Sequence, residues 1–255
     1  MRSFLAILLA VLVLDTARAE RIISALSAEK VEINSNFIGT DMVVFGSIER
    51  DAATVSRGAG YDIAIIMKGP PAHVVTRKKD RIFGIWINRE ARSFQSIPTF
   101  YALHSNKLTA DLASQKLLAK KQIGMNNISF SLINGGTAQQ QKADKEYIEA
   151  YRRLKANDNL FQVDNSSIDF LTNHLFKSTF HIPAKVPVGE YTIEFYLFNQ
   201  GSLLAETKNT FQVSKAGFEQ IVYDYSRNQS IAFGVVAVLL ALFTGWFGGV
   251  IFRRD

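Results

Sequence analysis

The stretch EYTIEFYLF at residues 190–198, with NQGS at 199–202 and LLAETKNTFQV at 203–213, predicts a β-hairpin. Both longer runs are rich in β-branched and aromatic residues, and the polar link between them supplies turn residues. Two prolines within residues 183–189 cannot donate to a sheet and therefore predict a turn just before the hairpin. We expect this hairpin to close an immunoglobulin-like β-sandwich.

Shorter strands are predicted upstream, at intervals near ten residues and with turn residues between them. A second hairpin is expected in which a strand beginning at Val31 turns at Gly39-Thr40-Asp41 and returns as residues 42–48. The remaining predicted strands are residues 61–67, 72–76, 82–88, 167–171 and 175–182. This spacing indicates a sandwich built as one large lobe or as two small ones.

Two helices are predicted in the middle of the chain, at residues 109–122 and 139–156, because both segments are rich in good helix formers. They flank a short strand candidate at residues 128–133. Thr137 with Gln140 has the form of a capping box and places the start of the second helix. In that helix, apolar side chains recur at helical spacing and predict one face packed on the body: Ala143, Tyr147, Ala150, Tyr151 and Leu154.

The first nineteen residues have the pattern of a cleaved secretory signal peptide. A basic start at Arg2 precedes an uncharged run at residues 4–14, and the A-x-A motif ends at Ala19. A retained membrane helix is the alternative, but the run reaches only about 16 Å, whereas a bilayer core is about 30 Å thick.

Residues 231–252 predict a transmembrane helix, since they contain no ionisable side chain and would be about 33 Å long as a helix. Arg253 and Arg254 follow directly. By the positive-inside rule they are expected to stay cytoplasmic, which places the body outside. The signal peptide predicts the same topology.

Together these patterns predict a mainly β body with two inserted helices and one C-terminal transmembrane helix. In the stem before that helix, Phe218, Ile221, Val222 and Tyr225 form one apolar stripe. The expected segments are a signal peptide (1–19), an N-terminal β part (20–108), a helical middle (109–157), a C-terminal β part (158–214), the stem (215–230), the transmembrane helix (231–252) and a cytoplasmic tail (253–255).

One face of the predicted transmembrane helix consists of small side chains. Ala237, Ala241, Gly245 and Gly249 recur every four residues and allow another helix to approach closely. The partner would be a second copy or a larger membrane protein. The competing interpretation is ordinary composition, because Gly and Ala are frequent in transmembrane helices.

The charge of the chain gives one candidate anion contact. The formal charge is +6, and removing the predicted signal peptide and tail leaves 25 cationic and 21 acidic side chains. The densest basic run is Arg77, Lys78, Lys79 and Arg81, between two predicted strands. It is suited to contact anionic headgroups or a small anionic ligand, and the alternative is a solvated hairpin loop. Nucleic acid is not an expected partner outside the cytoplasm.

The residues give no sign of catalysis. Without cysteine, the chain has no thiolate nucleophile, no cysteine metal ligand and no disulfide. The motifs of common hydrolases, zinc proteases and nucleotide-binding proteins are absent from the sequence, and His174 and His181 would lie on opposite faces of a strand. We therefore expect no enzymatic activity, cofactor or metal. The aromatic residues from Phe94 to Tyr101, with Trp86 upstream, are interpreted as core or as the lining of a groove.

The chain also resembles a known family through motifs that occur in order. These are Asn36-Phe37-Ile38-Gly39-Thr40, Lys68-Gly69-Pro70-Pro71, Gly84-Ile85-Trp86-Ile87-Asn88, Ile97-Pro98-Thr99-Phe100-Tyr101, Val186-Pro187-Val188-Gly189-Glu190-Tyr191 and Gly245-Trp246-Phe247. It is similar in these to the alphaproteobacterial transmembrane proteins labelled Alph_Pro_TM. The resemblance implies a bacterial inner membrane with the body in the periplasm, and it supplies no catalytic residues.

Two functions are expected from these observations. The first is a non-enzymatic accessory or interaction subunit of an inner-membrane complex, for which the resemblance suggests a transporter as the neighbour. The alternative is a tethered periplasmic protein that binds a small anionic ligand.

Overall fold

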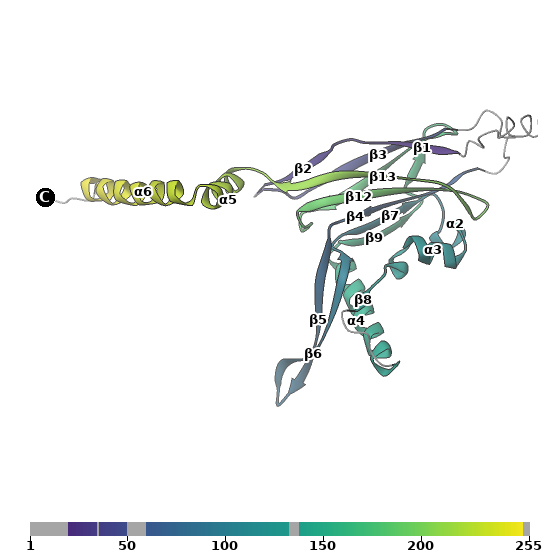
Figure 1. The fold of residues 1–255 in the computed structure, drawn as a ribbon, viewed down its shortest axis with the longest axis horizontal. Helices are drawn as coiled ribbons and strands as arrows, with labels where there is room; N and C mark the ends of the chain where they lie inside the picture. Colours follow the sequence, from purple (N-terminus) through teal and green to yellow (C-terminus); the bar gives the residue numbers. More distant parts are fainter. Residues whose placement is uncertain (1–19, 35, 50–59, 133–137, 252–255) are drawn as a thin grey trace, which may run out of the picture.

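The computed structural model describes residues 20–34, 36–49, 60–132 and 138–251. The predicted signal peptide, Thr137 of the capping box, and the charged tail with Arg253 and Arg254 lie outside the described residues. The described part is a β body from which a long hairpin projects on one side, with two successive helices leaving one end (Figure 1).

Two packed sheets form the body. The first has the order β1-β3-β11-β10 and the second β2-β13-β12-β4-β7-β9. The strands of the first sheet are β1 (Arg21–Leu26), β3 (Gly39–Glu49), β11 (Leu175–Pro183) and β10 (Ile168–Phe170). Those of the second are β2 (Lys30–Ile33), β13 (Ser202–Lys215), β12 (Gly189–Asn199), β4 (Asp62–Lys68), β7 (Tyr101–Ser105) and β9 (Phe161–Asn165).

This strand order is that of an immunoglobulin sandwich. The first sheet corresponds to strands A, B, E and D, and β13-β12-β4 to G, F and C, with β7 and β9 added at the edge as in variable domains. Tyr191, near the start of the F-like strand β12, donates its hydroxyl to the carbonyl of Pro187 at 2.7 Å. That bond is the tyrosine corner typical of these domains. The predicted sandwich is confirmed.

The predicted closing hairpin is also confirmed. Strands β12 and β13 pair antiparallel up to Asn199 and Ser202, and Gln200 and Gly201 both have positive φ angles of 49° and 80°. Two positive φ angles define the type I′ turn that matches the twist of paired strands.

One apolar core fills the space between the sheets. It takes fully buried side chains from strands on both sides of the helical middle, including Val44, Ile65, Phe176, Phe180 and Phe195. Both sheets also combine strands from residues 20–108 and 158–214. The body is therefore one large sandwich, not two small lobes.

The predicted hairpin over residues 31–48 is wrong. Strand β2 pairs in parallel with β13 of the second sheet, whereas β3 pairs with β1 and β11 of the first. The loop after Ile33 therefore crosses between the sheets instead of turning back along one of them. Strand β1 was not predicted from the sequence. Without β1, the preceding strand at Val31 was the nearest predicted partner for β3, which explains the error.

The helical middle is partly as predicted. The first helix is divided into α2 (Thr109–Leu112) and α3 (Gln115–Lys121), because Ala113 is extended and α3 starts anew at Ser114. A short 3₁₀ turn, η1 (Met125–Asn127), precedes β8 (Ser131–Leu132). Of the strand predicted at residues 128–133, the described part up to Leu132 is extended into a paired strand only at these two residues. The second helix is α4 (Ala138–Asn157); it buries Tyr147 and Tyr151 but leaves Leu154 57% exposed.

Two further helices extend from the end of β13 in Figure 1. The stem is helix α5 (Phe218–Asn228), and α6 (Ser230–Ile251) follows at once. Within the described residues, α6 is long and apolar enough to cross a membrane, and none of it is buried by the body.

Histidine 104 gives the sandwich a predicted dependence on pH. Its ring stacks on Phe180 at 3.8 Å between centroids, and its Nδ1 lies 2.7 Å from Ser178 Oγ. Because Ser178 donates its own proton to the carbonyl of Ser167, Nδ1 of His104 carries the hydrogen in this bond. Burial lowers the pKa of His104 to about 4, against a smaller opposing effect of Asp164.

We expect the free energy of unfolding to fall as the pH drops from about 6.5 to about 4. In this range His104 is protonated in the unfolded chain but remains neutral in the folded chain. The slope for this one group is at most about 1.4 kcal/mol per pH unit. Urea unfolding of the full-length protein in detergent, followed by circular dichroism, measures it. The His104→Gln variant should lose this part of the slope, while His181→Gln at an exposed position should keep it. Equal slopes for all three proteins would contradict the assignment.

Candidate functional site

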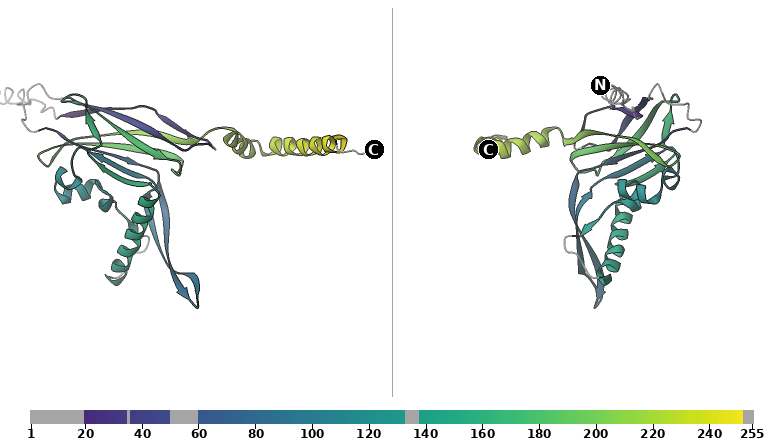
Figure 2. Two further views of the ribbon diagram at one scale, coloured as in Figure 1. Left: turned by 180° about the vertical axis from the view of Figure 1, so that it is seen from behind. Right: turned by 45° about the vertical axis from the view of Figure 1, so that its right-hand side comes forward.

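The hairpin that projects from the body is formed by β5 (Pro71–Ile82) and β6 (Ile85–Pro98); we call it the arm. It is inserted between β4 and β7, and its strands pair from Pro71 with Pro98 to Ile82 with Ile85. Phe83 and Gly84 form the turn, with positive φ angles of 49° and 84°. Figure 2 shows the arm standing clear of the sandwich from two further directions.

The basic run was predicted as a loop, and this prediction is wrong. Arg77, Lys78, Lys79 and Arg81 all lie in strand β5. The chain turns later, at Phe83-Gly84, because a two-residue turn of this type needs positive φ angles and glycine adopts them readily.

Aromatic side chains pack the base of the arm onto the body. Phe130 meets Phe94 of β6 edge to face at 5.6 Å and Tyr151 of α4 at 5.9 Å, and Tyr151 meets Phe161 in the same way. Arg152 lies over the Phe130 ring and donates to the carbonyl of Ile128. These rings join the base of the arm to the core of the body, because Phe94, Tyr151 and Phe161 belong to that core and Phe130 packs against it.

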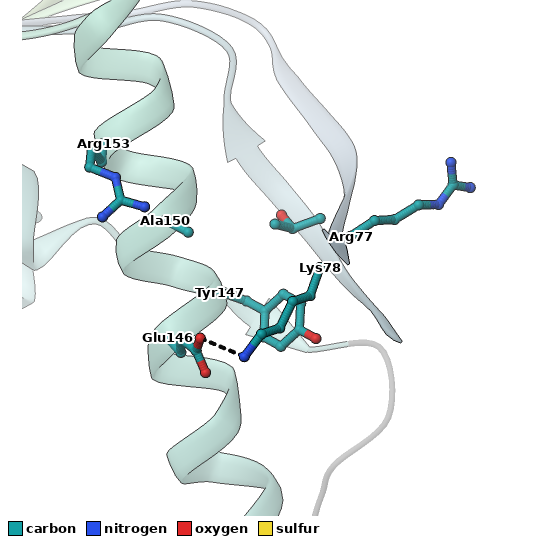
Figure 3. Close-up of a pocket in the computed structure, with 7 residues that line it drawn as sticks. Arg77, Lys78, Glu146, Tyr147, Ala150 and Arg153 are labelled. Carbon is teal, nitrogen blue, oxygen red and sulfur yellow. Dashed lines mark hydrogen bonds and ion pairs between the residues drawn. The ribbon is translucent and has the colours of Figure 1, made fainter. Parts of the chain in front are cut away.

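Helix α4 supports the middle of the arm through ion pairs. Arg92 Nε lies 2.9 Å from Asp144 Oδ1, and its guanidinium covers the Tyr147 ring at 5.4 Å. Further out, Lys78 Nζ lies 2.9 Å from Glu146 Oε1 (Figure 3). This hydrogen bond and the charge of Glu146 raise the pKa of Lys78. The supported part of the arm therefore extends at least to Lys78.

Beyond these contacts the arm ends in an apolar segment, residues 82–87, which we call the tip. Its five large side chains are all exposed: Ile82 by 38%, Phe83 by 101%, Ile85 by 67%, Trp86 by 65% and Ile87 by 42%. Exposed apolar clusters on soluble surfaces mark sites of interaction. The tip was not singled out from the sequence, although the run IFGIWI is apolar at six successive positions within a basic hairpin.

The four predicted anion contacts do not converge on one point. A pocket of about 230 Å³ between the arm and α4 is lined by Arg77 and Lys78 together with Glu146, Tyr147 and Arg153. In Figure 3 the Lys78 ammonium points to Glu146, whereas the Arg77 guanidinium points away from α4.

The other two predicted contacts lie outside this pocket. Lys79 is exposed, and Arg81 donates from Nε to the carbonyl of Gly84 at 3.3 Å.

The aromatic cluster proposed as core or groove is mostly core. Phe94, Phe100 and Tyr101 are fully buried. The Tyr101 hydroxyl donates to the carbonyl of Gln122 and accepts from the amide of Gly124, so it fixes the segment after α3. Trp86 does not belong to this core, because it lies at the exposed tip of the arm.

Charge is concentrated on the arm. Residues 77–92 contain six cationic and two acidic side chains, a net charge of +4. Residues 20–252 as a whole also have a net charge of +4, so the remainder of the body, stem and membrane helix is neutral overall. The arm is thus both the basic and the apolar extremity of the body.

The small side chains of the membrane helix lie on α6 as predicted from their spacing. An added Cβ at Gly245 or Gly249 would meet nothing within 4 Å in the described chain. Thr244 is the polar exception in the middle of the helix, and its hydroxyl bonds to the carbonyl of Leu240 at 2.7 Å, which satisfies it inside the helix. The whole helix is therefore compatible with lipid, and the stripe Ala237, Ala241, Gly245 and Gly249 is open to a neighbour.

Among the described residues, no group of three or more histidine or acidic side chains is placed to hold a metal ion. His181 instead bonds to Asp41 at 2.8 Å on the surface.

The apolar helix α6 and the mainly β body give the chain the form of a membrane-anchored protein. No curated protein matches the sequence. A family model does, over residues 21–254, and this span takes in the sandwich, the arm and the whole C-terminal helix α6. The chain belongs to the family described as "Putative transmembrane protein (Alph_Pro_TM)".

Proposed function

We propose that this membrane-anchored protein is a non-enzymatic interaction subunit of a bacterial inner-membrane complex, with the body in the periplasm and the C terminus in the cytoplasm. The predicted signal peptide and the two arginines that follow α6 in the sequence support this topology. The observation that carries the role is the arm, which is held in place by α4 while its apolar tip is exposed.

The exposed tip does not contribute to the stability of the body. Its core is filled by side chains such as Ile65, Phe176 and Phe195, and the tip contributes nothing to it. A hairpin that is anchored at its base and apolar at its end is instead suited to contact a partner.

The membrane helix offers a second contact. Its stripe of small side chains would let a helix of the partner approach closely, and van der Waals packing of this kind drives association in lipid. We infer that arm and stripe contact the same complex, one outside the membrane and one within it.

A role in binding a small anion has less support. Of the four predicted anion contacts, Lys78 is already paired with Glu146 of α4, and the guanidinium of Arg77 points away from α4. An incoming anion would have to compete with that carboxylate.

Purification from native membranes in a mild detergent tests the proposal. We expect the full-length protein to elute as a complex with at least one other integral membrane protein, in a fixed ratio. The pair Gly245→Leu and Gly249→Leu should reduce the recovered partner by about tenfold, because leucine keeps the two helices apart. Gly248→Leu, about 100° around the helix from Gly249, is the matched control and should leave recovery unchanged. A monomer in the wild type would refute the proposed role.

A further inference from the structure

The direction of the arm says where its contact lies. Figures 1 and 2 show the arm leaving the body sideways from the line of α5 and α6, from the end of the sandwich nearer to α5. A helix that spans the membrane runs roughly along the bilayer normal. With α6 in that direction, the arm runs alongside the membrane surface, and the eleven residues of α5, about 16 Å of helix, separate the body from the span.

The tip is apolar all round. Arg81 pairs with Trp86, and Asp80 pairs with Ile87, so alternate side chains point to opposite faces of the hairpin. Ile82, Ile85 and Ile87 share one face, Trp86 lies on the other, and Phe83 is fully exposed in the turn. A flat surface would cover only one of these faces. The tip is therefore shaped for a pocket that surrounds it.

Three cations at alternate positions of β5 lie on the face of the arm that also carries Trp86, and we call them the collar: Arg77, Lys79 and Arg81. Within the described residues, no carboxylate forms an ion pair with any of the three; Asp80 pairs with Arg89 and Glu146 with Lys78. Unpaired charges beside an apolar anchor fix the charge of the complementary surface, so the part of the pocket rim that faces the collar must be acidic.

We propose that the tip docks in an apolar pocket with an acidic rim on the extramembrane part of a second integral membrane protein, placed laterally in the same membrane. This inference rests on the proposed function and names the kind of partner and the element that recognises it. The bilayer suits a cationic aromatic tip chemically, but the arm points along the membrane and not into it.

Site-specific photocrosslinking of the full-length protein in its native membrane tests this. With p-benzoylphenylalanine at position 83, we expect a crosslink to an extramembrane segment of another membrane protein, near Asp or Glu residues of that segment. Position 38 is the control, because Ile38 is 91% exposed but lies outside the arm, and it should give no such product.

Two sets of variants test the chemistry of the site. Arg77→Glu with Lys79→Glu should lower the crosslink yield from position 83 by about tenfold, while Lys116→Glu with Lys120→Glu on the exposed face of α3 should not. Phe83→Ser with Trp86→Ser should remove the partner from the purified complex without lowering the melting temperature, since both side chains are exposed.

Several results would overturn the inference. A crosslink from position 83 to lipid would assign the tip to the bilayer, and one to another copy of this chain would assign it to self-association. A complex that survives the tip variant unchanged would refute the arm as docking element, and the role as an interaction subunit would then rest on the contact through the α6 stripe alone. Absence of any complex in the wild type would remove both.

Discussion

Replacing Gly46 with alanine is expected to destabilise the sandwich by about 3 kcal/mol, at the upper end of what added volume costs in a packed core. Gly46 of β3 pairs directly with Phe176 of β11, and the Phe176 ring lies over it. A Cβ at position 46 would lie only 2.1 Å from Cζ of that ring. The ring is fully buried and packed against Phe170 and Phe195, so it cannot move aside without disturbing both.

Urea unfolding of the full-length protein in detergent measures this effect. Gly60→Ala is the matched control, because an added Cβ there meets nothing within 4 Å, and its stability should change by less than about 0.5 kcal/mol. Combining Gly46→Ala with Phe176→Leu should recover part of the loss, since the smaller side chain leaves room for the methyl group. If Gly46→Ala unfolds like Gly60→Ala, the ring does not occupy the position described.

The parts of the fold that local sequence determines were predictable. The closing hairpin carries its own turn signal at Gln200 and Gly201, and α4 has both helix formers and a periodic apolar face. The pairing partner of a strand, in contrast, could not be predicted from local sequence. Strand β2 pairs with β13, about 180 residues further along the chain, and nothing in the alternation of β2 identifies that partner.

The arm shows how charge can mislead a prediction. A run of four cations in five positions predicts a loop, because such runs are usually solvated. They are solvated here too, but within a strand, since β5 needs no apolar face once it leaves the body. Glycine at position 84, with its positive φ, was the better sign of where the chain turns.

Only one of the two proposed contact regions, the stripe on α6, could be predicted from the sequence. The stripe on α6 could be identified because helical spacing alone places Gly245 and Gly249 on one face. The tip could not, because the sequence IFGIWI does not tell whether its side chains are buried. Only the position of the hairpin outside the sandwich shows that they remain exposed.

A buried ionic cluster on the second sheet gives the other large expected effect. Glu194 of β12 has a nearly buried carboxylate that accepts bonds from Lys68 at 2.7 Å, Lys208 at 2.9 Å and the Tyr196 hydroxyl at 2.8 Å. Burial raises the pKa of Glu194, but these three donors together outweigh it and hold the pKa below its usual 4.5. The carboxylate therefore stabilises the fold above about pH 4.5, and this contribution declines as the pH falls further.

Glu194→Ala is expected to cost about 3–5 kcal/mol, because it leaves the largely buried ammonium of Lys68 without a counterion. Glu206→Ala breaks the more exposed pair with Lys121 and should cost less than about 1 kcal/mol, which makes it the matched control in the same unfolding assay. Glu194→Leu combined with Lys68→Met should restore much of the stability, since it removes both buried charges together. A loss that persists in this double variant would mean that Glu194 stabilises the sheet through Tyr196 and Lys208, and not mainly by neutralising Lys68.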